Sequence, residues 1–190
     1  MRDHHSRWQP ETTMLVSDSG VRTIFLVGFM GAGKTTVGLA LSRKLGWPFE
    51  DLDERIEARE GRPIDQIFEQ SGEAEFRKME HSALRSLIQE LGASPKVLAL
   101  GGGAFAQASN AALLAGFPLV FLDAPVEELF RRCQEQELKR PLRRELAEFQ
   151  RLYDARRPCY LKAAVRIETG GKDVEEVADE TIKSLGLTIG

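Results

Sequence analysis

One glycine-rich stretch, Gly-Phe-Met-Gly-Ala-Gly-Lys-Thr at residues 28–35, constrains the fold of this chain more than any other feature. It fits the P-loop pattern of a glycine, four residues of any kind, and then Gly-Lys-Ser/Thr. Residues 23–27 before it are β-branched and apolar, which is typical of a buried strand, and residues 36–45 repeat apolar side chains at helical spacing. A strand, this loop and a helix in that order predict a site where backbone N–H groups surround a phosphate.

The P-loop pattern also gives expected roles to its final residues. The ε-amino group of Lys34 should reach the β- and γ-phosphates of a nucleotide, and the hydroxyl of Thr35 should bind Mg²⁺. The residues of the loop and the first helical turn that we expect to contact ATP are Gly31, Ala32, Gly33, Lys34, Thr35 and Thr36.

Composition excludes several classes of function. A net charge of −3 with no long basic run disfavours a nucleic-acid-binding protein. No apolar run approaches the roughly 18 residues that a membrane span needs. Cys133 and Cys159 form no Cys-x-x-Cys motif, which favours a reduced, cytoplasmic setting. We therefore expect a cytoplasmic protein, and a monomer, that binds neither nucleic acid nor a membrane.

Strand and helix patterns alternate through residues 21–190, which we expect to form one domain, whereas residues 1–20 lack periodicity and predict a disordered tail. Further strands are expected at residues 47–53, 96–100, 118–123 and 165–168. Helices are expected at residues 54–59, 63–70, 72–91, 108–114, 125–137, around 152, and 174–185. This alternation predicts an α/β fold of three layers, with a five-stranded parallel sheet between helices on both faces.

Three aspartates follow predicted strands, and ligands of open α/β sheets bind at that edge. Of Asp51 and Asp53, one carboxylate could hold Mg²⁺ through water, and the other could orient or deprotonate an acceptor hydroxyl. Asp53 fits equally well as the N-cap of the next helix. Asp123 ends the most apolar of the predicted strands, so by pattern alone it is a better candidate for a magnesium ligand than Asp51 or Asp53. It could equally well cap the helix that begins near Pro125.

Glycines and an arginine could complete this site. The glycines at residues 101–103 follow a predicted buried strand, where they would allow a ligand close to the backbone or form a flexible turn. Arg77 stands three residues before Glu80, so it could present a fixed guanidinium to a carboxylate or form an exposed ion pair.

Two arginines later in the chain could likewise either bind a ligand or be exposed to solvent. Arg156 could bind an anion or lie on a solvated helix face. Arg140 lies in the charge-dense segment 138–149, which predicts either a basic lid that closes over phosphates or a solvated loop.

Together these pieces resemble the shikimate kinase family, from about residue 23 to the final helix. The sequences that carry the resemblance are Gly-Phe-Met-Gly-Ala-Gly-Lys-Thr-Thr at 28–36, Asp-Leu-Asp at 51–53, Gly-Glu-Ala-Glu-Phe-Arg-Lys-Met-Glu at 72–80, Leu-Gly-Gly-Gly at 100–103, Arg-Pro-Leu at 140–142 and Arg-Arg-Pro-Cys-Tyr at 156–160.

The resemblance implies a P-loop kinase fold with a lid at about residues 138–149. It also implies phosphoryl transfer from ATP to the 3-hydroxyl of shikimate, a step toward chorismate and the aromatic amino acids. Mg²⁺ is then the cofactor, with Thr35 as a direct ligand and Asp51 in contact through water. Arg140 is implied to bind ATP from the lid.

The resemblance further implies the residues that act on the acceptor. Those expected to bind shikimate are Asp53, Arg77, Gly101, Gly102, Gly103 and Arg156. Those expected in catalysis are Lys34, Asp53 and Arg140. Asp123 has no such role in the family, so a helix cap is the remaining expectation for it.

Two alternatives stay open. One is another small-molecule kinase of this architecture, such as a gluconate or nucleotide kinase, although no base-binding pocket is specified by the sequence. The other is a non-catalytic sensor with a kinase-like fold, which the presence of Lys34 and Asp53 disfavours.

Overall fold

The computed structural model describes residues 22–92, 94–137 and 146–188. The predicted tail at residues 1–20 and most of the predicted lid, Arg140 included, lie outside the described residues. Residues 146–149, which we assigned to the lid, form the first turn of a helix instead.

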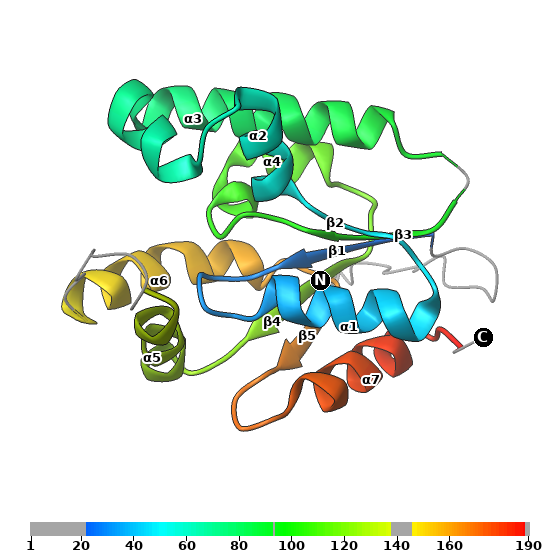
Figure 1. Cartoon of the computed structure of the whole chain (residues 1–190). Helices are drawn as coiled ribbons and strands as arrows, with labels where there is room; N and C mark the ends of the chain where they lie inside the picture. Colours follow the sequence, from blue (N-terminus) through cyan, green and yellow to red (C-terminus); the bar gives the residue numbers. More distant parts are fainter. Residues whose placement is uncertain (1–21, 93, 138–145, 189–190) are drawn as a thin grey trace, which may run out of the picture.

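Five parallel strands form one sheet in the order β2-β3-β1-β4-β5 (Figure 1). Their bounds are β1 Thr23–Val27, β2 Phe49–Asp51, β3 Lys96–Ala99, β4 Leu119–Asp123 and β5 Val165–Glu168. The central strand β1 pairs with β3 on one side and with β4 on the other, with Phe25 opposite Leu98 and Leu119. The five-stranded parallel sheet that the sequence predicts is confirmed, and all five carboxyl ends lie at one edge.

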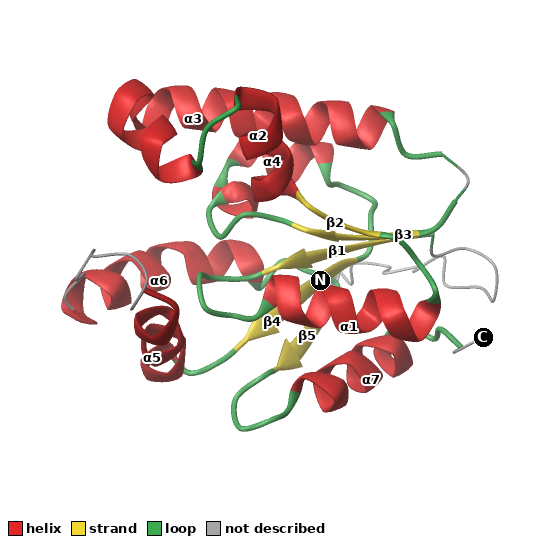
Figure 2. Cartoon of the chain, in the orientation of Figure 1, coloured by secondary structure: helices red, strands yellow, loops and turns green. Residues whose placement is uncertain are grey.

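Helices cover both faces of this sheet, with α3 and α4 on one side and α1 and α7 on the other (Figure 2). Their bounds are α1 Lys34–Leu45, α2 Leu52–Glu60, α3 Ile64–Gln89, η1 Ala104–Ala106, α4 Ala108–Leu113, α5 Val126–Glu137, α6 Leu146–Tyr160 and α7 Val174–Ser184, of which η1 is a short 3₁₀ helix. None of the helices in the described ranges is long and apolar enough to cross a membrane.

Glycines end or break three of these helices. Gly46 and Gly61 follow α1 and α2 in the left-handed conformation, each with φ of 66°, which glycine adopts without strain. Gly72, with φ of 76° and ψ of 169°, interrupts α3. The two helices predicted at residues 63–70 and 72–91 are therefore one element with a break between them.

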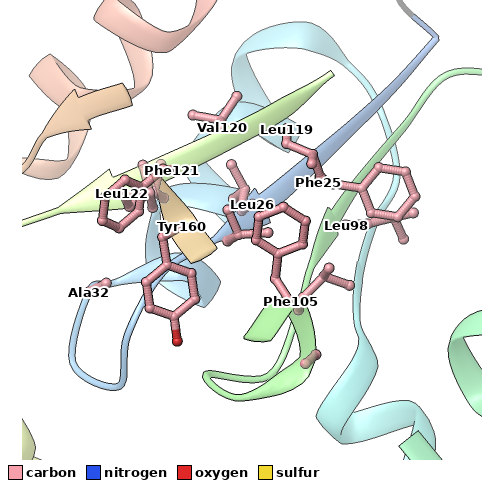
Figure 3. Close-up of a cluster of buried hydrophobic side chains, with 14 of the residues drawn as sticks. Phe25, Leu26, Ala32, Leu98, Phe105, Leu119, Val120, Phe121, Leu122 and Tyr160 are labelled. Carbon is pink, nitrogen blue, oxygen red and sulfur yellow. The ribbon is translucent and has the colours of Figure 1, made fainter. Parts of the chain in front are cut away.

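Strands β1 and β4 are buried along their whole length and form the centre of the core (Figure 3). Tyr160, the last residue of α6, is also fully buried, and its ring stacks on Phe121 of β4 at a centroid distance of 5.3 Å. Burying an apolar side chain of this size stabilises a fold by roughly 1.5–3 kcal/mol. The end of α6 is therefore fixed against the sheet.

Candidate active site

The P-loop follows β1 and turns back on itself into α1. Gly31 and Gly33 have φ values of 78° and 83°, a region that side chains other than glycine rarely adopt. A β-carbon at Gly31 would also lie 2.5 Å from the carbonyl oxygen of Leu129 in α5. Glycine is therefore required here both by the backbone conformation and by the packing of α5.

Gly33 occupies the N-cap of α1, so Lys34, Thr35 and Thr36 form the first turn. The first N–H groups of a helix have no acceptor within the helix, and together with the helix dipole they favour a bound anion. The predicted phosphate site therefore coincides with a helix N-terminus.

Lys34 lies across this loop. Its Nζ donates to the carbonyl oxygens of Gly28 and Phe29, each at 3.0 Å. Burial lowers the pKa of Lys34, and the negative charges of Asp53 and Asp51 oppose that shift. A half-buried cation at the first turn of a helix is suited to neutralising phosphate charge.

Thr35 and Asp51 bring two oxygen ligands together at the end of β2. The Thr35 hydroxyl donates to Asp51 Oδ2 at 2.8 Å, and Asp51 Oδ1 accepts from the backbone N–H of Asp53 at 2.9 Å. Asp51 is thus the N-cap of α2, so the alternative that Asp53 caps this helix is wrong. Hydroxyl and carboxylate oxygens are ligands that Mg²⁺ prefers.

No group of three or more His, Cys, Asp and Glu residues suited to a metal ion occurs within the described ranges.

Asp53 has an unsatisfied carboxylate. Its Oδ1 is buried and has no hydrogen-bond partner among the described residues. Burial and the nearby charge of Asp51 raise the pKa of Asp53 to about 6, against the opposing effect of Lys34. A β-carbon at Gly101 would lie 2.5 Å from the same Oδ1. This oxygen is therefore available to a ligand hydroxyl, and the glycine after β3 makes room for it.

Arg77 is held in a fixed orientation on α3. Its Nη1 donates to both carboxylate oxygens of Glu80, at 3.1 and 3.0 Å, and its Nη2 donates to Glu73 at 3.1 Å. Its side chain is 16% exposed and that of Glu80 only 1%, so the alternative of an exposed ion pair is wrong. Burial disfavours the guanidinium charge, but Glu80 and Glu73 together outweigh it and raise the pKa of Arg77.

The remaining N–H groups of Arg77 lie close to the glycine-rich loop. Its Nε is buried without a hydrogen-bond partner in the described part of the chain. A β-carbon at Gly103 would lie 2.6 Å from its Nη2. Arg77 therefore keeps a donor for a ligand that lies next to this loop.

Arg156 approaches the same loop from α6. Its Nη1 donates to the carbonyl oxygen of Gly102 at 3.4 Å, and the Tyr160 hydroxyl donates to that oxygen too. The guanidinium lies 5.8 Å from the ring centroid of Phe29 in the P-loop. The sequence did not single out Tyr160 or Phe29, although the spacing of four residues between Arg156 and Tyr160 places both on one helix face.

Asp123 is not a helix cap, and the expectation that it would be one is wrong. Helix α5 begins at Val126, so Asp123 lies outside its N-cap. Its Oδ1 accepts from the Tyr153 hydroxyl at 3.0 Å, and its Oδ2 accepts from Arg157 at 2.9 Å and from Arg166 at 3.0 Å. These partners occupy both oxygens.

The structure thus brings the P-loop, Asp51, Asp53 and the glycine-rich loop to one edge of the sheet, with Arg77 and Arg156 contacting that loop from two helices. Arg140 is the one predicted site residue that lies outside the described residues.

Comparison with known proteins identifies this arrangement. Residues 30–186 match the family model "Shikimate kinase". A shikimate kinase from Aquifex aeolicus is 42% identical over 164 residues, which cover 85% of this chain and 95% of the relative. One from Persephonella marina is 37% identical over 163 residues, with coverage of 85% and 98%.

Solved structures agree. The shikimate kinase from Acinetobacter baumannii in complex with shikimate superposes with a TM-score of 0.77 at 37% identity, covering 88% of this chain and 94% of that one. A gluconokinase from Sinorhizobium meliloti has a TM-score of 0.55 at 19% identity, with coverage of 86% and 91%, and so shares only the fold. The chain therefore belongs to the shikimate kinase family, as its sequence motifs indicated.

Proposed function

We propose that this protein transfers the γ-phosphoryl group of ATP to the 3-hydroxyl of shikimate, giving ADP and shikimate 3-phosphate for aromatic amino-acid biosynthesis. Membership of the shikimate kinase family supports the reaction, as does a solved relative that binds shikimate. The observation that carries the mechanism is the buried Oδ1 of Asp53, which has no hydrogen-bond partner among the described residues and lies at the same edge of the sheet as the P-loop lysine.

The acceptor would be held by its carboxylate and its hydroxyls. Arg77 and Arg156 would bind the carboxylate, because a guanidinium donates two parallel hydrogen bonds to such a group. Gly101, Gly102 and Gly103 would let the ring approach the backbone. A side chain would collide with Asp53 at residue 101 and with Arg77 at residue 103, and at residue 102 it would crowd the backbone of Met30. Asp53 would then accept a hydrogen bond from the 3-hydroxyl.

The donor phosphates would be held by the P-loop. The N–H groups of Gly31 to Thr36 and the amino group of Lys34 would contact the β- and γ-phosphates. Arg140 would bind ATP from a lid in the segment 138–149. The Thr35 hydroxyl would bind Mg²⁺ directly, and Asp51 would bind it through water. This cation would neutralise phosphate charge.

Proton transfer would fall to Asp53. As the 3-hydroxyl oxygen forms its bond to the γ-phosphorus, its proton would pass to Asp53 Oδ1, and the bond from the γ-phosphorus to the bridging oxygen would break to release ADP. A carboxylate with a pKa of about 6 is ionised at neutral pH, yet it is more basic than an ordinary aspartate.

We propose further that the enzyme acts as a monomer in the cytoplasm. The two cysteines outside any Cys-x-x-Cys motif support the cytoplasmic setting, and the net charge of −3 disfavours a nucleic-acid partner. Its partners would be the small molecules ATP and shikimate alone.

The test is a coupled assay of ADP release with shikimate, gluconate and a panel of nucleoside monophosphates as acceptors. We expect turnover with shikimate, loss of turnover in excess EDTA, and no comparable activity with the other acceptors. Equal or greater turnover of gluconate or a nucleotide would contradict the proposed acceptor, and no turnover with any of them would support the sensor alternative.

Lys34→Ala provides the matched test of the donor site. We expect a loss of roughly 100-fold or more in kcat, because a cation aimed at developing phosphate charge is removed. Lys44→Ala is the control, since Lys44 lies on the same helix but pairs with Glu175 and Asp179 of α7. Wild-type kcat in a folded Lys34→Ala protein would contradict the role of the P-loop lysine.

A further inference from the structure

Four residues outside the proposed reaction form a charged cluster at the carboxyl end of β4. We call Asp123, Tyr153, Arg157 and Arg166 the Asp123 cluster. The carboxylate of Asp123 is 3% exposed, while the side chains of Arg157 and Arg166 are 32% and 45% exposed. One buried anion thus links three elements, namely β4, β5 and α6.

The cluster has two separable arms. Arg166 reaches Asp123 from β5, the neighbouring strand of the sheet. Tyr153 and Arg157 reach it from α6, and the Arg157 Nε donates to the Tyr153 hydroxyl at 2.9 Å. Burial and the charge of Asp123 raise the pKa of Tyr153, so its hydroxyl keeps its proton and donates. Only the second arm restrains α6.

The same stretch of α6 faces the proposed acceptor site. Arg156 is the residue directly before Arg157, and it donates to the Gly102 carbonyl. Successive helical residues point about 100° apart, so a helix turned to place Arg157 on Asp123 presents Arg156 to another surface. The ring of Tyr153 also packs on Phe29 of the P-loop at 5.5 Å. A rotation or shift of α6 would therefore move Arg156 relative to both loops.

We propose that Arg157 is a positioning residue for the acceptor: by binding Asp123 it fixes the rotation of α6 and thereby holds Arg156 at the Gly102 loop. Arg157 does not touch the proposed substrate, and it acts through its neighbour. The proposal rests on the proposed function only where it concerns shikimate. Its structural part, the restraint of α6, stands independently of the acceptor's identity.

The kinetic test compares the two arms of the cluster. Arg157→Gln should raise the KM for shikimate by about five- to tenfold, because a misplaced binding group weakens the hold on the substrate. Both kcat and the KM for ATP should change by less than about twofold, as expected when only acceptor binding is lost. Arg166→Gln removes a positive partner of the same carboxylate oxygen but keeps the contacts of Arg157 and Tyr153 with Asp123. Helix α6 therefore stays restrained, and the KM for shikimate of this variant should equal the wild-type value.

A double mutant separates positioning from a general loss of stability. Arg156→Ala removes the residue through which Arg157 would act, so adding Arg157→Gln to it should raise the KM for shikimate no further. Additive effects would overturn the proposal. Equal increases in KM for Arg157→Gln and Arg166→Gln would overturn it as well.

Hydrogen exchange tests the restraint without any substrate. Amides in residues 146–160 should exchange faster in Arg157→Gln than in Arg166→Gln or the wild type, because α6 loses a link to the sheet. Tyr153→Phe, which keeps the ring against Phe29, should show a smaller increase. Unchanged exchange in Arg157→Gln would overturn the proposal even if shikimate proved not to be the acceptor. Faster exchange with no shikimate turnover by the wild type would overturn only the proposed function.

Discussion

Two aspartates at the same edge of the sheet have opposite surroundings. Asp123, at the end of β4, has both oxygens bonded to Tyr153, Arg157 and Arg166. Asp53, just after β2, keeps a buried Oδ1 without a partner among the described residues. A satisfied carboxylate stabilises the fold, whereas an unsatisfied one costs stability and is available to a ligand.

Sheet topology explains the difference. Strand β4 lies between β1 and β5, and the neighbouring elements supply Arg166 and Arg157. Strand β2 is an edge strand whose one neighbour, β3, runs into the glycines at 101–103, which have no side chain to offer Asp53. The fold thus places hydrogen-bond partners around Asp123 at the end of β4, but none of the glycines near Asp53 offers a side chain to it.

The largest effect should come from Asp53→Asn. The amide keeps the size of the side chain but cannot accept the hydroxyl proton, so kcat should fall roughly a thousandfold. Asp123→Asn should keep kcat within about tenfold of the wild type, since it touches neither substrate. The coupled assay measures both, and a comparable loss of kcat in the two variants would remove the distinction between the two carboxylates.

A substitution at Gly101 would displace the side chain of Asp53 without replacing that residue. In Gly101→Ala the new β-carbon would lie 2.5 Å from Asp53 Oδ1, so the carboxylate must move. A displacement of this kind should lower kcat about a hundredfold. Gly92→Ala is the control, because a β-carbon there would have no heavy atom within 4 Å. Equal activity of the two alanine variants would show that the position of Asp53 is not critical.

The two aspartates should also differ in the sign of their effect on stability. The folded protein raises the pKa of Asp53 from 3.8 to about 6, so this group destabilises the fold above that range. In the absence of nucleotide and metal at pH 7.5, Asp53→Asn should raise the free energy of unfolding by about 2 kcal/mol. Asp123→Asn should lower it by about 2 kcal/mol, because it removes charged hydrogen bonds.

Urea denaturation at several pH values would test the origin of these effects. The advantage of Asp53→Asn should shrink as pH falls from about 6 toward 3.8, because wild-type Asp53 becomes protonated and neutral in the folded state. A gain in stability that did not vary across this interval would contradict burial of the charge as its cause.

The smallest effect should be a pH dependence of the reaction rate. If ionised Asp53 accepts the proton, kcat/KM for shikimate should fall about tenfold per unit below pH 6 and be level above it. Asp123→Asn should keep the same profile. A profile without a break between pH 5 and 7 would argue against Asp53 as the base.

Much of this fold could be predicted from sequence because its signals are local. The apolar strands and the order of strand, loop and helix around the P-loop each depend on neighbouring residues, and both are confirmed. The roles of Asp51 and Asp53 depend on where β2 ends, and a shift of two residues exchanges the helix cap and the free carboxylate. Local pattern could not decide that, and it left η1 undetected because so short a helix has no periodicity.

The long-range contacts of Asp123 could not be predicted from local pattern. The partners of Asp123 lie 30, 34 and 43 residues further along the chain, so only the folded sheet brings them together. The sequence pattern around Asp123 therefore left a cap as the expectation, which is wrong, because the carboxylate binds Tyr153, Arg157 and Arg166 instead.

The central position of β1 has a consequence for partial unfolding. Strand β1 is at most 7% exposed along its length and pairs on both sides, so the P-loop is attached to the part of the protein that opens only with the whole molecule. Asp53 and Arg77 lie instead beyond an edge strand and on a helix broken at Gly72. As denaturant increases, the enzyme should lose its hold on the acceptor while it still binds nucleotide.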